Sequence, residues 1–291
     1  MYGRLHFAFG SEHSSDELTR SRFVVSLNGG EYMGFIGGDL AYRFLRFYAP
    51  NGAASMLNAS AYAGKSKIRA LLGEKLMSEI RGRDVIDFGC GEGDETIEMA
   101  LAGARFVTGL DIQDQRFPAA RTKAVAAGVD DRVEFRASSS KAADVIVCID
   151  SFEHFGDPAE ILRIMASLLK PSGQVIASFG PTWYHPLGGH LFSVFPFAHL
   201  LFTEAVLMRW RTDFKTDGAT KFSEVAGGLN QMTVARFIQL VEKSPLRIDR
   251  LETVPIRKLK AVANHWTREF TTAIVRCTLV HRDRAGVISA H

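Results

Sequence analysis

The stretch DVIDFGCGEGDET, residues 84–96, constrains the fold of this chain more than any other. A short apolar segment, 84–88, runs directly into glycines at positions 89, 91 and 93, and a run with helical spacing follows from residue 94. Glycine has no Cβ, so such a turn bends sharply and lets a ligand approach the backbone. A buried strand, a glycine turn and a helix in this order predict the first unit of a parallel α/β sheet.

The same alternation continues to residue 180. Strands alternating with helices of about ten residues predict right-handed βαβ crossovers and a parallel sheet. The apolar segment 144–149 has no polar alternation, as expected of a strand buried on both faces. The further strands are expected at 105–110, 133–136, 144–149 and 174–179, and the helices at 94–102, 118–127 and 159–169.

The flanking segments extend this core. Helices are expected at 37–48, 65–81 and 233–243, and two last strands at 247–256 and 270–280. The predicted fold is a doubly wound, mostly parallel seven-stranded sheet with an N-terminal helical extension and a helical or loop insertion after the fifth strand. The expected parts are a cover laid over one end of the sheet (1–61), a core (62–180), an insertion or lid (181–232) and a C-terminal part that completes the sheet (233–291).

Composition narrows the class of protein. With 46% hydrophobic and 23% charged residues the chain is a packed globular protein, and a net charge of +3 gives no case for a nucleic-acid partner. The apolar window 187–208 is interrupted by glycines, Pro196 and charged or polar residues, so no transmembrane helix is expected. Three scattered cysteines and no secretory start predict a cytoplasmic protein.

An acidic residue marks the end of the second strand. Asp111 lies 20 residues after Gly91, the distance at which a carboxylate accepts hydrogen bonds from ribose hydroxyls. A dinucleotide fingerprint would need a third glycine at position 94, which is Asp94. Asp87, ahead of Gly89, would repel a pyrophosphate but suits a cationic amino group or a sulfonium. The sign of the charge therefore favours S-adenosylmethionine over NAD.

Four stretches carry a family resemblance. DVIDFGCGEGDET resembles motif I of class I S-adenosylmethionine-dependent methyltransferases, and GLDIQ resembles their ribose-binding acidic position. CIDSFEHFGDP is similar to the end of their fourth strand, where many small-molecule members read D-x-x-E-H, and LLKPSGQVIASF is similar to their fifth strand. The resemblance covers residues 62–180. It implies S-adenosylmethionine as cofactor and S-adenosylhomocysteine as product.

The resemblance also assigns cofactor contacts. It implies that the glycine loop and Asp87 hold the methionine part, that Asp111 takes the ribose with Ile112 against the adenine, and that the end of the fourth strand lies along the methionine. The chain departs from the family where an aspartate often contacts the adenine amino group, because residues 137–140 read ASSS. The cofactor candidates are Asp87, Gly89, Cys90, Gly91, Asp111, Ile112, Ser138, Ser139, Ile149 and Asp150.

Methyl transfer from a sulfonium is an in-line displacement, so the protein must position the acceptor, exclude water and, for a hydroxyl or amine, remove a proton. Histidine suits the last task. The candidates are His154 after the fourth strand, and His185 and His190 in the stretch GPTWYHPLGGH after the fifth. The alternatives are that His154 caps the following helix or bonds Asp150 or Glu153, and that the loop is purely structural.

A metal held by the two loop histidines would need a third ligand, which His199 or Glu204 could provide. The spacing of the two histidines is not a recognised zinc spacing, so no metal is expected.

Aromatic residues surround these histidines. Trp183, Tyr184, Phe192 and Phe195 are candidate substrate contacts, and the apolar segment 191–202 would line a hydrophobic pocket or form a lid that expels water. Core packing and a face for a homodimer are the alternatives for this segment.

The leading hypothesis is a methyltransferase that moves a methyl group to O, N or C of a small or lipid-like acceptor. The D/N-P-P-Y/F signature of nucleic-acid amino methylation is absent after the fourth strand. The alternatives are a non-catalytic binding or scaffold protein, a cyclisation or decarboxylation on the same cofactor, and methylation of a protein.

Overall fold

The computed structural model describes residues 34–52, 66–225 and 228–283, all of which belong to the unit spanning residues 32–291. The predicted N-terminal cover, 1–61, therefore lies largely outside the described residues. Its one described helix is α1 (Gly38–Tyr48), close to the predicted bounds.

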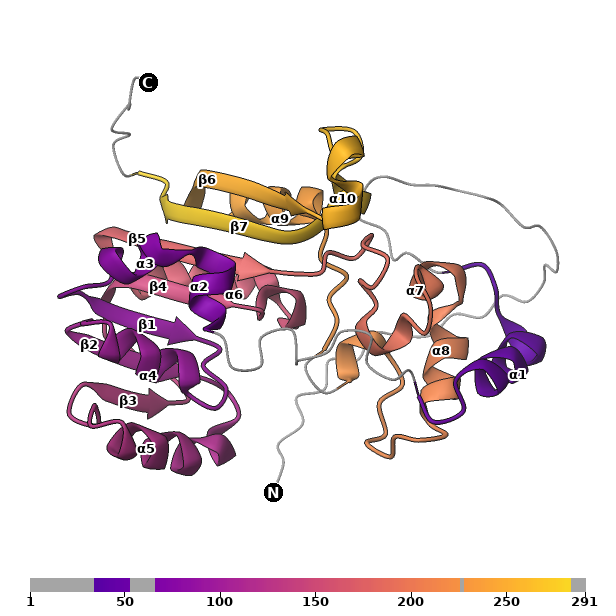
Figure 1. The fold of residues 1–291 in the computed structure, drawn as a ribbon, viewed down its shortest axis with the longest axis horizontal. Helices are drawn as coiled ribbons and strands as arrows, with labels where there is room; N and C mark the ends of the chain where they lie inside the picture. Colours follow the sequence, from indigo (N-terminus) through magenta and orange to yellow (C-terminus); the bar gives the residue numbers. More distant parts are fainter. Residues whose placement is uncertain (1–33, 53–65, 226–227, 284–291) are drawn as a thin grey trace, which may run out of the picture. The chain divides into compact units, whose positions relative to one another are not determined.

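A seven-stranded sheet is the centre of the fold (Figure 1). Its strand order is β3-β2-β1-β4-β5-β7-β6, and β7 runs antiparallel to both of its neighbours while the other pairs are parallel. The prediction of a doubly wound, mostly parallel sheet is confirmed. The strands are β1 (Asp84–Phe88), β2 (Phe106–Leu110), β3 (Val133–Arg136), β4 (Ala143–Ile149), β5 (Leu169–Phe179), β6 (Leu246–Pro255) and β7 (Thr272–His281).

Each face of the sheet is covered by helices. Successive residues of a strand point to opposite faces, so Val85 packs on one side and Ile86 on the other. The Val85 face carries α2 (Lys67–Leu72), α3 (Glu74–Glu79), α4 (Asp94–Leu101) and α5 (Phe117–Ala126). The Ile86 face carries α6 (Pro158–Ser167) and α9 (Val234–Glu242). Two buried clusters, one on each face, make the sheet doubly wound.

Two elements differ from the sequence prediction. The helix expected at 65–81 is broken into α2 and α3 at Gly73, whose φ of 81° lies in the left-handed region that glycine adopts without strain. Strand β5 begins at Leu169, whereas the strand was expected from residue 174. The first difference divides one expected helix into two and the second lengthens a strand; neither changes the order of the strands.

A third buried cluster lies in the insertion that follows β5. We call this region the cap; it comprises α1 and residues 181–225, with α7 (Ala198–Leu201) and α8 (Glu204–Arg211). Helix α1 packs against α8, whereas the sequence placed it over one end of the sheet (Figure 1). Trp210 Nε1 donates to the carbonyl oxygen of Ala49 at 2.9 Å and ties the two helices together.

Short elements connect these parts. A search of the described helices finds none with the length and apolar character needed to cross a membrane. The remaining helices are α10 (Arg268–Thr271) and the 3₁₀ helices η2 (Asp114–Arg116), η3 (Phe152–His154), η4 (His190–Phe192), η5 (Phe222–Glu224) and η6 (Arg257–Val262).

Candidate functional site

The carboxyl ends of β1, β2, β4 and β5 meet at one edge of the sheet. Strands β2 and β4 lie on opposite sides of β1, so the chain reverses its direction of winding there. In open α/β sheets ligands bind outside the carboxyl ends of the strands at such a point. The glycine loop, Asp111, Asp150 and the first residues of the cap all follow strands that end at this edge.

The glycine loop turns in the way its composition predicts. Gly89, Gly91 and Gly93 have φ values of 87°, 52° and 80°, which side chains with a Cβ rarely adopt. The N–H groups of Gly89 and Cys90 both donate to the carbonyl oxygen of Leu110, at 2.8 and 3.0 Å. A Cβ at Gly89 would lie 2.6 Å from Ser151 Oγ. The loop is therefore attached to the end of β2 and lies directly against Ser151, two residues after the end of β4.

Backbone donors hold the carboxylate of Asp111. Gly91 N–H donates to its Oδ2 and Gln113 N–H to its Oδ1, each at 2.8 Å. Each carboxylate oxygen retains a lone pair that can accept a further hydrogen bond. The next side chain, Ile112, is apolar yet 90% exposed. A fixed carboxylate beside an uncovered apolar surface is compatible with a ribose and an adenine, and the contacts of Asp111 and Ile112 with the cofactor stay predictions.

Asp87 is buried below the loop. Its side chain is 3% exposed, and its Oδ2 accepts a hydrogen bond from Thr96 Oγ1 at 2.6 Å. Burial raises the pKa of Asp87 to about 7, Thr96 opposes the rise, and the carboxylates of Glu95 and Asp111 add to it. A cation bound above the loop would favour the ionised form.

Cys90 enters the site through its backbone only. Its side chain is buried on the Val85 face of the sheet, and burial raises the pKa of the thiol far above its usual range. The thiol therefore stays protonated.

The end of β4 lies next to the glycine loop. Asp150 has a φ of 49°, and its N–H donates to the carbonyl oxygen of Ser178 at 2.9 Å. Burial raises the pKa of Asp150 to about 6, with Lys67 opposing the rise. A left-handed aspartate is an uncommon conformation that often occurs at functional sites. Ile149 and Asp150 thus lie where the resemblance placed them, and their contact with the cofactor stays a prediction.

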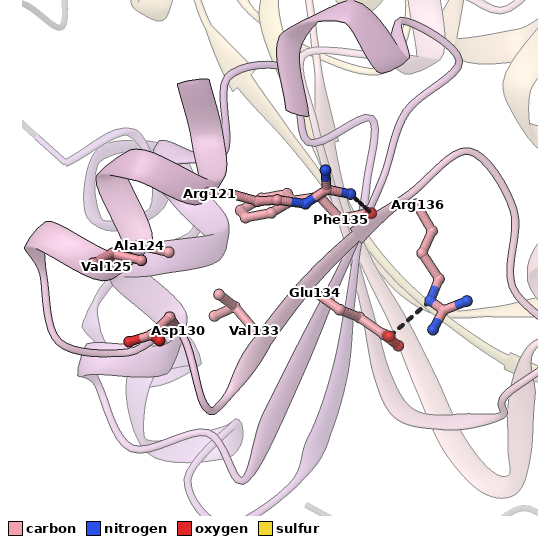
Figure 2. A pocket seen from close by; sticks show the side chains of 8 residues that line it. All are labelled: Arg121, Ala124, Val125, Asp130, Val133, Glu134, Phe135 and Arg136. Carbon is pink, nitrogen blue, oxygen red and sulfur yellow. Dashed lines mark hydrogen bonds and ion pairs between the residues drawn. The ribbon is translucent and has the colours of Figure 1, made fainter. Parts of the chain in front are cut away.

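The two hollows nearest β3 lie at the outer edge of the sheet. A cavity of about 450 Å³ between α5 and β3 is lined by Arg121 and Glu134, among others, and Figure 2 shows Arg121 pointing to the carbonyl oxygen of Phe135. Ser138 and Ser139 line a second hollow of about 340 Å³ just beyond β3. Because β3 is an edge strand, the first cavity lies along the flank of the sheet and not at the winding reversal. The adenine contact of the two serines stays a prediction.

Two of the three candidate histidines come together at the other side of the site. The rings of His154 and His190 lie 5.1 Å apart between centroids, at 72° to one another. Glu153, 4% exposed, completes the group, and the ligand atoms of the three side chains all lie within 4.8 Å of one another. We call Glu153, His154 and His190 the histidine cluster.

The polar atoms of the histidine cluster are only partly satisfied. The N–H at Nδ1 of His154 donates to the carbonyl oxygen of Gly228 at 2.8 Å, which leaves Nε2 as the acceptor. Glu153 Oε1 accepts from Gly180 N–H at 3.3 Å. Within the described residues, Glu153 Oε2 and His190 Nε2 are buried without a hydrogen-bond partner. Buried polar atoms are seldom left unpaired, so these two atoms indicate a ligand.

Burial sets the protonation of the cluster. It lowers the pKa of His190 to about 4, and the nearby histidines, His154 first, lower it further. It raises the pKa of Glu153 to about 8. His190 is therefore neutral near pH 7 and offers a lone pair.

The cluster is close to the glycine loop. His154 N–H donates to the carbonyl oxygen of Ser151 at 2.9 Å, and Ser151 is the residue that touches Gly89.

His185 lies outside the cluster. Its Nδ1 accepts a hydrogen bond from Leu187 N–H at 2.9 Å, which closes a local turn, and burial lowers its pKa to about 4. His199, which the sequence considered only as a further metal ligand, bonds Ser193 Oγ and the carbonyl oxygen of Trp183. These two histidines hold the cap together.

The aromatic candidates are distributed through the cap. Trp183 and Phe192 are 1% exposed and pack inside the cap cluster. Tyr184 is half-buried with its ring 5.1 Å from that of Phe270, and half-buried Phe195 packs edge-on against Tyr48. Their contact with a substrate stays a prediction, because the two buried rings are already enclosed by protein.

Glu153 was missed as a functional residue. The sequence considered it only as a hydrogen-bond partner of His154, because no linear spacing connects it with His190. Nothing in the sequence indicated that residues 228–230 bind η3. Asn230 Nδ2 donates to the carbonyl oxygens of Phe152 and Phe155 at 2.7 and 2.9 Å.

Comparison with known proteins is consistent with this geometry. A family model described as a methyltransferase domain matches residues 59–215, more than half of the chain. The ubiquinone biosynthesis O-methyltransferase of Neisseria meningitidis is 40% identical over 108 residues, which cover 35% of this chain and 45% of the relative. The protein of the same name from Sodalis glossinidius is 41% identical over 103 residues, covering 33% and 41%. The chain therefore spans less than half the length of these curated relatives.

Among solved structures, an S-adenosylmethionine-dependent methyltransferase from Mesorhizobium loti aligns with 70% of this chain and 94% of its own, at 17% identity and a TM-score of 0.46. The family match, the strand order and the glycine loop carry the assignment. The chain belongs to the methyltransferase-domain family, as a class I member whose cofactor is S-adenosylmethionine.

Proposed function

We propose that this chain transfers the methyl group of S-adenosylmethionine to a hydroxyl oxygen of a small, apolar acceptor. The observation that carries the proposal is the position of the histidine cluster, one turn of chain beyond the residue that touches Gly89. The relatives named O-methyltransferases support an oxygen acceptor.

The residues divide the work by position. Bound S-adenosylmethionine supplies an electrophilic methyl group on a sulfonium. The glycine loop and Asp111 orient the cofactor with backbone amides and one fixed carboxylate. The histidine cluster receives the acceptor hydroxyl and handles its proton, since both imidazoles can present a lone pair. Its burial keeps competing water away from the reacting oxygen.

The cap supports an apolar, lipid-like acceptor. Its core is built largely of aromatic and aliphatic side chains, and α1 leaves Phe44 and Phe47 exposed. Apolar exposed surface of this kind often serves binding. The homodimer and the cytoplasmic location remain predictions from the sequence.

The test is methyl transfer with labelled S-adenosylmethionine and a panel of phenols and aliphatic alcohols with alkyl chains of increasing length. We expect label on oxygen, with KM falling as the chain lengthens. Amines and carboxylic acids of matched size are the comparison compounds, and Asp111→Ala is the control that should lose cofactor binding.

Two outcomes would overturn the proposal. Label appearing only on amines or on added protein would contradict an oxygen acceptor. Tight cofactor binding with no transfer to any acceptor class would favour the scaffold alternative or a different reaction on the same cofactor.

A further inference from the structure

Glu153, His154 and His190 form a group that the methyl-transfer geometry does not fully explain. Removing a proton needs one base, yet here two imidazoles and one carboxylate converge within 4.8 Å. Glu153 is only 4% exposed, and its Oε2 has no hydrogen-bond partner in the described part of the chain. A buried polar oxygen without a hydrogen-bond partner is costly, which indicates that something binds to it.

The surroundings resemble those of metal ligands. A metal-bound histidine almost always donates its other N–H to a carbonyl or carboxylate, as His154 does to Gly228 at 2.8 Å. Ligating carboxylates are themselves hydrogen-bonded, as Glu153 Oε1 is by Gly180 N–H. The free atoms, His190 Nε2 and Glu153 Oε2, are the ones a metal would need.

We propose that Glu153, His154 and His190 bind one divalent transition-metal ion, of which Zn²⁺ is the representative. No metal was expected from the sequence, because the spacing of His185 and His190 in the loop matches no known zinc site. The ligand set joins η3, at the end of β4, to η4 in the cap, and these elements are distant in sequence.

The ligand types select the metal. Imidazole nitrogen suits Zn²⁺, Fe²⁺ and Ni²⁺, whereas Mg²⁺ and Ca²⁺ prefer oxygen. Two histidines and one glutamate are a donor set of catalytic zinc sites, with ligands at about 2.0–2.2 Å and a further position open. Tetrahedral geometry at that radius separates ligand atoms by about 3.4 Å, so binding would draw the three side chains at most about 1.4 Å closer together.

The fourth coordination position of the ion could bind the acceptor oxygen. This catalytic role of the metal rests on the proposed function. An acceptor hydroxyl bound to the ion would have a lowered pKa, as metal-bound water does, so it would release its proton to solvent on binding and the oxygen anion would then take the methyl group. The two histidines would then act as ligands, and the ion would also anchor the cap to the core.

The experiment measures metal binding without cofactor or acceptor. Chelator-treated protein is dialysed against micromolar Zn²⁺ with millimolar Mg²⁺ present, and metal content is determined by mass spectrometry. We expect one Zn²⁺ per chain. Glu153→Gln and His190→Ala should each weaken zinc binding by more than about 100-fold, since even residues behind the ligands contribute 10–100-fold. His185→Ala, in the same loop but outside the cluster, is the matched control and should bind normally.

A second measurement avoids the variants. Co²⁺ added to the intact protein should give the intense visible absorption of a four-coordinate site, and one equivalent of Zn²⁺ should abolish it. Absence of that band, or zinc retention that Glu153→Gln and His190→Ala leave unchanged, would overturn the proposal. Because neither assay includes methyl transfer, zinc binding without transfer would refute the proposed function alone. Transfer without zinc binding would refute the metal site alone.

Discussion

The two sides of the site are built in different ways. The cofactor side relies on backbone groups at the ends of two consecutive strands, where Gly91 N–H holds Asp111 across a separation of 20 residues. The histidine cluster relies on side chains from η3 and η4 and a carbonyl from Gly228. Among the described residues, the glycine loop and Asp111 have no buried side-chain polar atom without a hydrogen-bond partner, whereas two buried polar atoms of the histidine cluster have no partner there. The proposed cofactor site, which the whole family shares, is thus formed by backbone geometry. The proposed acceptor site, which is particular to this chain, depends on tertiary contacts between side chains.

The largest expected effect is on the cofactor side. Asp111→Ala should raise the Kd for S-adenosylmethionine by about 10²–10⁴-fold, because hydrogen bonds to a charged group are worth about 1.5–3 kcal/mol and two ribose hydroxyls would lose theirs. Calorimetry measures the change. Asp114→Ala, an exposed neighbour on η2, is the control and should bind normally. An equal loss of cofactor affinity in both variants would show that this segment tolerates no substitution and that Asp111 has no specific role in binding.

The histidine side should show the opposite pattern. His190→Ala should lower kcat by about 10²-fold or more while the Kd for S-adenosylmethionine changes less than about twofold, since the residue handles the acceptor. His185→Ala should lower kcat far less, because its ring only closes a turn with Leu187. Steady-state kinetics and calorimetry on the two variants check this. If His190→Ala and His185→Ala have similar kcat values, His190 has no special catalytic role and the loop is only structural.

A smaller effect should come from the adenine surface. Ile112→Ser should raise the Kd for S-adenosylmethionine about tenfold, because covering one large aliphatic side chain is worth about 1.5–3 kcal/mol. S-adenosylhomocysteine should lose affinity to the same extent, since its adenosine is identical. If adenosine itself binds both proteins equally, Ile112 does not contact the base.

The smallest expected effect is a pH dependence. The pKa of Asp87 is raised to about 7, mainly by burial, and a bound cation would lower it. The free protein therefore holds a proton that the complex releases, so affinity rises with pH up to about 7 and then levels off. A lowering by about one pKa unit would strengthen binding at most about tenfold. S-adenosylhomocysteine, which lacks the sulfonium, should show a weaker rise. Asp87→Asn should flatten the curve; an unchanged slope would assign the titration elsewhere.

Sequence reasoning reached most of the fold for an identifiable reason. Buried parallel strands read as unbroken apolar runs, and glycines at 89, 91 and 93 must stand where φ is positive, so both leave a local signature. The break at Gly73 and the early start of β5 were missed, because packing decides where a helix bends or a strand begins.

By itself the sequence determined the order of strands and helices, the ligand edge of the sheet and the cofactor class. Those properties follow from consecutive strand, turn and helix segments, whose patterns and spacing can be read along the chain. Only the tertiary structure decided that His190 meets His154 and that His185 does not. It also decided that Glu153 lies between core and cap with one oxygen that has no hydrogen-bond partner among the described residues. Side chains far apart in sequence converge through the packing of the cap and of residues 228–230 against η3, and no local pattern encodes that packing.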